Sequence, residues 1–274
     1  MEPLKILVLT DFSPLSKLAV NYALKMGNHL SAEFTILSVV RLDGVPKSNL
    51  KWKQIEKALV TVAEEEGEKL LQELRGKTKS KLTFKAIKGH TVADVVRRYT
   101  QRHYTNLVVM GSQGASNLKK FRLGGTTVSV IDAIYSPVLA IPKQAEYKNF
   151  KHIVYATDLQ NVKKELEMIV PFAKIFGTHV HMAHVVTAVD KRMETERKFV
   201  EKLIAESGYD KIDFKLIIDD DISEAIDLYI QQTKADLLTT FTHQLNLYEK
   251  LFGLSVTRRL AYQGNIPLLA FKRK

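Results

Sequence analysis

The sequence repeats itself, and this internal repeat is the feature that most constrains the fold. The segment LKILVLTDFS near the start reappears as KHIVYATDLQ at residues 151–160, and each copy is an apolar run that ends in Thr-Asp. Asp11 and Asp158 are equivalent at an offset of 147 residues, and Pro137 and Pro267 at an offset of 130. A chain of 274 residues therefore divides into two similar halves, joined by the polar segment KQAEYKNF.

Each half alternates apolar runs with amphipathic helix patterns. The runs ILVL, NLVVM and PVLAI are apolar throughout, as expected for strands of a parallel sheet that is covered on both faces. Strands that alternate with helices predict right-handed βαβ crossovers. We therefore predict an α/β fold of two tandem, doubly wound α/β/α sandwiches, residues 1–146 and 147–274, each with a five-stranded, mainly parallel sheet. In such sheets ligands bind beyond the carboxyl ends of the strands, where the strand order reverses.

The halves differ in length at one place. The offset is 146 residues for Val39 and Val185 but 130 for Tyr99 and Tyr229, so the second half lacks 16 residues between its second and third strands. In the first half this place holds a long connection, which begins RLDGVPKSNL and ends in a helix pattern.

The charge is unevenly distributed. The chain has 41 Lys and Arg against 30 Asp and Glu; residues 1–146 have 22 against 13, and the remainder has 19 against 17. A basic first half favours anionic partners such as nucleotides, nucleic acid or acidic surfaces, although a solvated basic surface fits equally well. No apolar run approaches the ~20 residues of a membrane span. The start of the sequence lacks a secretory signal pattern, so we expect a cytoplasmic protein that does not insert into membranes.

A glycine-rich segment, GSQGASNLKKFRLGGTT, covers residues 111–127 between a strand pattern and a helix pattern. Glycines let the backbone approach a ligand closely, and successive N–H groups can form an anion-binding concavity. A helix that starts at Thr126 or Thr127 would add free N–H groups, and threonine hydroxyls could cap it or donate to a phosphate. The segment matches neither the Walker pattern nor the usual dinucleotide fingerprint. A glycine-rich turn without a ligand therefore remains an alternative.

The spacing Gly-x2-Gly-x9-Gly, followed by small or hydroxyl residues, resembles the ATP-binding signature of the universal stress protein family. The resemblance extends to LVLTDFS at the start, KGHTVADVV in the middle and SPVLAIP at the end of the first half, and it covers the chain as two tandem copies. It implies a Rossmann-like (adenine nucleotide alpha hydrolase-like) fold. It also implies a bound adenine nucleotide, which is ATP or else AMP or ADP, and Mg²⁺ can bind together with it.

The resemblance further implies which residues hold the nucleotide. An aspartate at Asp11 contacts the adenine or ribose end, the main chain of the second strand contributes at Val39, and the glycine-rich segment holds the phosphates. The implied nucleotide-binding residues are Thr10, Asp11, Val39, Met110, Gly111, Gly114, Gly124, Gly125 and Thr126. One departure matters, because nucleotide-binding members usually have a serine where this chain has Gly125. A glycine N–H can still donate, and a neighbouring threonine can replace the hydroxyl.

The second half lacks this segment. At the 130-residue offset, bulkier residues stand where the glycines were: Phe241, Gln244 and Leu254. We expect the second half not to bind ATP and to serve packing, partner contact or another ligand. Asp158 remains, but an aspartate that ends a strand is also a common helix cap.

Three histidines occur in the second strand of the second half. His179 and His181 share a face while His184 points to the other, so the three do not converge on one metal. A structural or surface role is the favoured interpretation, with a two-histidine metal site as the alternative. No catalytic motif is present, so we do not expect an enzyme, although slow ATP hydrolysis is chemically feasible.

The leading hypothesis is a stress-response regulator or switch that binds ATP in its first half. The alternative is a nucleotide-free interaction scaffold, in which the two halves form a pseudo-dimer that recruits an unidentified protein partner. The chain could also form a homodimer, and nucleic acid is not the expected partner.

Overall fold

The computed structural model describes residues 2–28, 30–41, 50–112, 123–188, 193–242 and 266–273. The chain forms two compact units, and the boundary between them falls between Tyr147 and Lys148. Both units are α/β, with strands and helices alternating along the chain.

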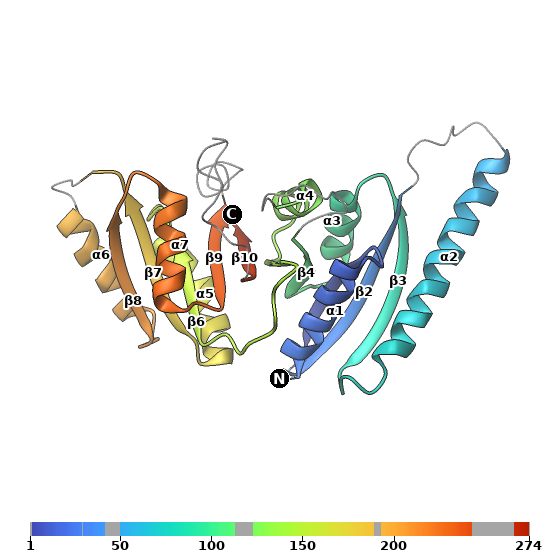
Figure 1. Cartoon of the computed structure of the whole chain (residues 1–274), viewed down its shortest axis with the longest axis horizontal. Helices are drawn as coiled ribbons and strands as arrows, with labels where there is room; N and C mark the ends of the chain where they lie inside the picture. The colour runs from blue at the N-terminus through green and yellow to red at the C-terminus, as the bar shows by residue number, and fades with distance from the viewer. Residues whose placement is uncertain are drawn as a thin grey trace. The chain divides into compact units, whose positions relative to one another are not determined.

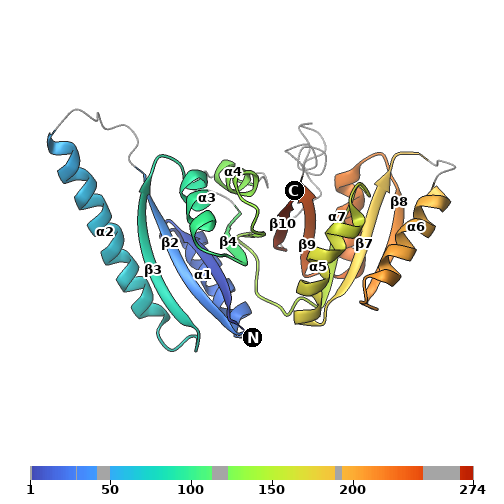
Figure 2. The same ribbon diagram turned by 180° about the vertical axis from the view of Figure 1, so that it is seen from behind.

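The first unit is a five-stranded parallel sheet covered by helices on both faces. Its strand order is β3-β2-β1-β4-β5, and each neighbouring pair is parallel. Helices α1 and α2 lie on one face, and α3 and α4 on the other (Figures 1 and 2). The elements are β1 Leu4–Thr10, α1 Pro14–Gly27, β2 Ala32–Arg41, α2 Leu50–Leu74, β3 Lys81–Gly89, α3 Val92–Arg102, β4 Leu107–Gly111, α4 Gly125–Ala133 and β5 Val138–Ile141.

The second unit has the same strand arrangement. Its order is β8-β7-β6-β9-β10, and the neighbouring pairs are again parallel. Helices α5 and α6 cover one face and α7 the other (Figures 1 and 2). The elements are β6 His152–Ala156, α5 Val162–Phe176, β7 His179–Val186, α6 Met193–Glu206, β8 Ile212–Ile218, α7 Ile222–Thr233, β9 Leu237–Thr242 and β10 Leu268–Lys272.

The structure confirms the predicted class of doubly wound α/β units with parallel sheets. The central strands are buried on both faces, since Leu7, Val8, Val108 and Val109 are almost fully covered. Most of the length difference between the second and third strands of the two units lies in the helix that joins them, because α2 has 25 residues and α6 has 14. Among the helices within the described ranges, none is long and apolar enough to cross a bilayer.

Candidate functional site

The strand order of the first unit reverses between β1 and β4. Strand β1 pairs with both β2 and β4, and the chain leaves these two neighbouring strands at Thr10 and Gly111. Thr10 lies opposite Ser38, so Val39 lies one residue beyond the last paired residue of β1. Asp11, Val39 and Gly111 therefore gather at the carboxyl edge of the sheet, at the switch point where such folds bind ligands.

A strained turn presents Asp11 at this edge. Phe12 has a φ of 61°, a left-handed conformation that is uncommon for a residue with a side chain. The turn is held by Thr10, whose Oγ1 accepts a hydrogen bond from the Phe12 N–H at 3.0 Å and lies 3.0 Å from Ser16 Oγ. Thr10 is buried and occupied by these contacts. Its hydroxyl therefore shapes the turn, and Asp11 is the polar side chain that the turn exposes.

The carboxylate of Asp11 is held in its ionised form. Burial opposes ionisation, but hydrogen bonds from Ser13 and Ser16 outweigh this effect and keep the pKa of Asp11 below its ordinary value. The Ser13 N–H donates to Asp11 Oδ1 at 3.1 Å. Asp11 thus offers an acceptor for hydroxyl or amino groups of a ligand, rather than a proton donor.

Gly111 has a packing reason to be glycine. A Cβ at this position would lie 2.7 Å from Leu15 Cγ, which is closer than real Cβ contacts allow. The preceding residue, Met110, is buried in β4. At Gly111 the absence of a side chain therefore lets α1 approach the end of β4, whether or not a ligand binds.

The helix that follows the glycine-rich segment begins one or two residues earlier than the sequence predicts. Gly124 is the N-cap and α4 starts at Gly125, so the expected start at Thr126 or Thr127 is corrected by one or two residues. Within the described residues, no side chain caps the helix. The hydroxyl of Thr127 instead donates to the carbonyls of Gly111 and Ser112, at 3.1 and 3.3 Å. It ties α4 to the end of β4 and is not available to a phosphate.

The first turn of α4 leaves donors unused within the described part of the chain. The Gly124 N–H is engaged, since it donates to the Ser112 carbonyl at 2.7 Å. The N–H groups of Gly125, Thr126 and Thr127 have no acceptor among the described residues. Among the described residues, a Cβ at Gly125 would meet nothing within 4 Å, so there is room at this position. An uncapped helix start with clear space is a favourable place for an anion.

A second polar group at this edge also lacks a described partner. Ser112 directly follows β4 and is 2% exposed, and its Oγ has no hydrogen-bond partner among the described residues. A buried hydroxyl without a partner is costly. Because the Ser112 carbonyl accepts the Gly124 N–H at 2.7 Å, this residue lies next to the start of α4. Gly114, the middle glycine of the predicted motif, lies outside the described residues.

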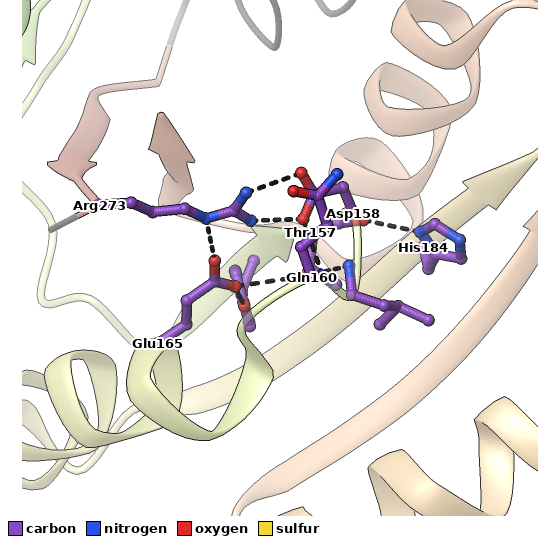
Figure 3. Close-up of polar contacts among 8 residues, drawn as sticks. Thr157, Asp158, Gln160, Glu165, His184 and Arg273 are labelled. Atoms are coloured by element: carbon purple, nitrogen blue, oxygen red, sulfur yellow. Dashed lines mark hydrogen bonds and ion pairs between the residues drawn. The ribbon is translucent and has the colours of Figure 1, made fainter. Parts of the chain in front are cut away.

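In the second unit the equivalent aspartate is paired with a side chain of the same unit (Figure 3). Asp158 follows β6 as Asp11 follows β1, and Leu159 repeats the left-handed conformation of Phe12 with a φ of 62°. The guanidinium of Arg273 donates to both carboxylate oxygens of Asp158, one bond measuring 2.8 Å, and its Nε donates to Glu165. Asp158 is therefore bound within the protein, whereas Asp11 is exposed.

A buried network surrounds this ion pair. The side chains of Arg273 and Glu165 are 4% and 2% exposed, and the Tyr155 hydroxyl donates to Glu165. Burial opposes the charge on Asp158, but the bonds from Arg273 hold its pKa below the ordinary value. Neither Arg273 nor Glu165 belongs to a motif that can be recognised in the sequence. Gln244 and Leu254, the residues that replace glycines in this half, lie outside the described residues, and Phe241 is buried in β9.

Fold and site together define a class of doubly wound α/β proteins that have an aspartate and an open helix start at the switch point of the sheet. The chain belongs to the universal stress protein family, whose model matches residues 4–142. Two curated relatives come from Methanocaldococcus jannaschii. Universal stress protein MJ0531 is 26% identical over 145 residues, covering 51% of this chain and 82% of the relative. Universal stress protein MJ0577 is 29% identical over 161 residues, covering 51% and 95%.

A solved structure resembles the whole chain. The crystal structure of a universal stress protein from Archaeoglobus fulgidus DSM 4304 covers 98% of this chain and 98% of its own, with a TM-score of 0.73 and 18% identity. At that identity the likeness concerns the fold. It includes the second unit, which lies beyond the residues that the family model matches.

Proposed function

We propose that the first unit binds an adenine nucleotide, ATP foremost, at the carboxyl edge of its sheet. The observation that carries the proposal is the uncapped first turn of α4, with open space at Gly125, beside the exposed carboxylate of Asp11. In this proposal Asp11 accepts hydrogen bonds from the ribose or adenine end and the main chain of Val39 lies against the base. The phosphates bind at Gly125 and Thr126, and Mg²⁺ can accompany them.

The missing serine does not argue against this proposal. Gly125 is the first residue of α4, so its N–H is one of the free donors of the helix start and does not depend on a side chain. The lost hydroxyl removes one donor, and the N–H groups of Gly125 and Thr126 in the first turn of α4 remain. We propose that a protein partner distinguishes the nucleotide-bound state of the first unit from the free state. The proposed activity is binding as a switch, not rapid turnover of ATP.

The Gly125→Asp variant tests this proposal. The space around Gly125 accommodates a side chain, and an aspartate in the first turn favours the helix dipole, so the variant should fold normally. Its carboxylate would, however, repel a phosphate at the same amides. By isothermal titration calorimetry we expect wild type to bind ATP and Gly125→Asp to bind at least about tenfold more weakly.

Two further variants serve as controls. Gly125→Ser adds a hydroxyl without charge and should bind ATP as well as wild type or better. Asn161→Asp places the same negative charge at the N-cap of α5 in the second unit and should leave ATP binding unchanged. Failure of the wild-type protein to bind ATP would overturn the proposal and favour the nucleotide-free scaffold. Equal affinities of wild type and Gly125→Asp for ATP would show that the phosphates do not bind at the start of α4.

A further inference from the structure

A cluster of imidazoles and a carboxylate lies in the second unit, at the amino ends of three neighbouring strands. His152 begins β6, His179 and His181 lie near the start of β7, and Asp213 is the second residue of β8. The parallel register places His152 opposite His179 and His181 opposite Asp213. Helix α7 contributes to the same cluster through Tyr229, and this helix covers that face of the sheet (Figure 1).

Three of these side chains aim their ligating atoms at one another. Asp213 Oδ2 lies 2.7 Å from His179 Nε2 and 2.8 Å from His181 Nδ1. The three ligating atoms all lie within 4.8 Å of one another. Two histidine nitrogens and a carboxylate oxygen are a ligand set that Zn²⁺ takes in proteins, with a fourth position left for water.

The groups around His179, His181 and Asp213 are of the kind that orient metal ligands. His181 Nε2 lies 3.0 Å from His152 Nδ1, so the nitrogen of His181 that does not face Asp213 has its own hydrogen-bond partner. The Tyr229 hydroxyl donates to Asp213 Oδ1 at 3.3 Å, which orients the other carboxylate oxygen toward the imidazoles. Partners of this kind fix the tautomer of a ligating histidine and the rotation of a ligating carboxylate.

The cluster is partly open to solvent. The side chain of His181 is 13% exposed, while those of His179 and Asp213 are 39% and 47% exposed. The present distances are those of hydrogen bonds, and ligands of a tetrahedral metal would lie about 3.3 Å apart. Because His179 and Asp213 are the more exposed members, they can move outward by this small amount. A metal can also reach the triad from solvent.

The first unit provides an internal comparison at equivalent register positions. Thr35 lies opposite Thr83 there, as His181 lies opposite Asp213 in the second unit, and Lys5 lies opposite Glu33, as His152 lies opposite His179. Thr35 and Thr83 hydrogen-bond to each other at 3.2 Å. Only a tyrosine from the covering helix, Tyr99, is retained, 3.4 Å from Thr35. The fold therefore does not require imidazoles at this place.

We propose that His179, His181 and Asp213 form a binding site for Zn²⁺ or a similar divalent transition-metal ion in the second unit. His152 and Tyr229 are positioning residues that orient the ligands. The site is independent of the proposed nucleotide site, because it lies at the opposite edge of the strands and in the other unit. Sequence analysis predicted that His179 and His181 share a face, and the structure adds the third ligand, Asp213.

The test is a titration of the metal-stripped full-length chain with Zn²⁺ in the absence of nucleotide. Wild type should bind one Zn²⁺ with a Kd of about 1 μM or lower. His181→Ala should lose this binding, and Tyr229→Phe should weaken it by about 10- to 100-fold. Co²⁺ in place of Zn²⁺ should give a visible absorption band with wild type and none with His181→Ala. Circular dichroism establishes that each variant is folded.

His184→Ala is the matched control. His184 lies on the same strand but hydrogen-bonds through Nδ1 to the Thr157 carbonyl at 2.8 Å, so its removal should leave Zn²⁺ binding unchanged. The proposal is overturned if wild type binds no Zn²⁺ in the micromolar range. It is equally overturned if His181→Ala, folded and stripped of metal, binds Zn²⁺ as tightly as wild type does.

Discussion

At the scale of single residues, Asp227 is an unusual group. It lies on α7 and is 5% exposed, and its Oδ2 has no hydrogen-bond partner among the described residues. Burial, and then the nearby carboxylates of Asp221 and Glu224, raise its pKa from 3.8 to about 7. The folded chain therefore keeps a proton on Asp227 that the unfolded chain releases at lower pH.

This retained proton predicts a pH dependence of stability. Between pH 4 and pH 7 the folded state binds more protons at Asp227 than the unfolded state does, so the free energy of unfolding falls as the pH rises. The full effect is at most about 4 kcal/mol and is complete above the folded pKa. Asp227→Asn should remove this component, so the variant gains stability relative to wild type as pH rises.

Urea denaturation at pH 5 and pH 8 measures this difference. The exposed Asp210→Asn provides a control that removes a carboxylate without changing the buried position. A difference between Asp227→Asn and wild type that stays the same at both pH values would contradict the assignment.

Among the contacts between elements, those of Arg273 connect the end of β10 to β6 and α5 in the second unit. Arg273 follows the last strand, and its guanidinium bonds to Asp158 after β6 and to Glu165 on α5. A buried charge that loses its partner is strongly destabilising. Arg273→Met should therefore lower the free energy of unfolding by about 3–5 kcal/mol, as measured by urea denaturation.

Two comparisons make this prediction specific. Arg273→Met combined with Glu165→Met removes the stranded buried carboxylate and should recover part of the loss. Lys143 stands at the equivalent position of the first unit and is exposed, so Lys143→Met should change stability by no more than about 0.5 kcal/mol. An Arg273→Met variant as stable as wild type would show that this ion pair does not stabilise the packing of β10.

The sequence predicts elements better than it predicts contacts between them. Apolar runs that end in Thr-Asp identify the β1 and β6 strand ends, because strand burial and turn chemistry are local properties. The start of α4 is displaced by one or two residues because glycine, rather than threonine, occupies the cap. Glu165 and Arg273 are 108 residues apart, and only the fold brings them together. Asp213 likewise joins the two histidines only through the β7–β8 register.

At the scale of the whole molecule, the two units share a strand order but differ at the same edge. The first unit exposes Asp11 beside an uncapped helix, whereas the second binds Asp158 with Arg273. At equivalent positions the duplicated fold thus has one exposed aspartate and one aspartate in an ion pair. This difference is the basis for the central claim, that one unit holds a nucleotide and the other does not.

The number of nucleotides that a chain binds tests this claim most directly. Native mass spectrometry of the full-length protein, saturated with ATP and Mg²⁺, counts bound nucleotides without assuming an affinity. We expect one nucleotide per wild-type chain, and a clearly lower occupancy for Gly125→Asp at a concentration that just saturates wild type. Two nucleotides per wild-type chain would show that the Arg273–Asp158 ion pair does not keep a nucleotide out of the second unit. A wild-type chain without a bound nucleotide would contradict the site in the first unit.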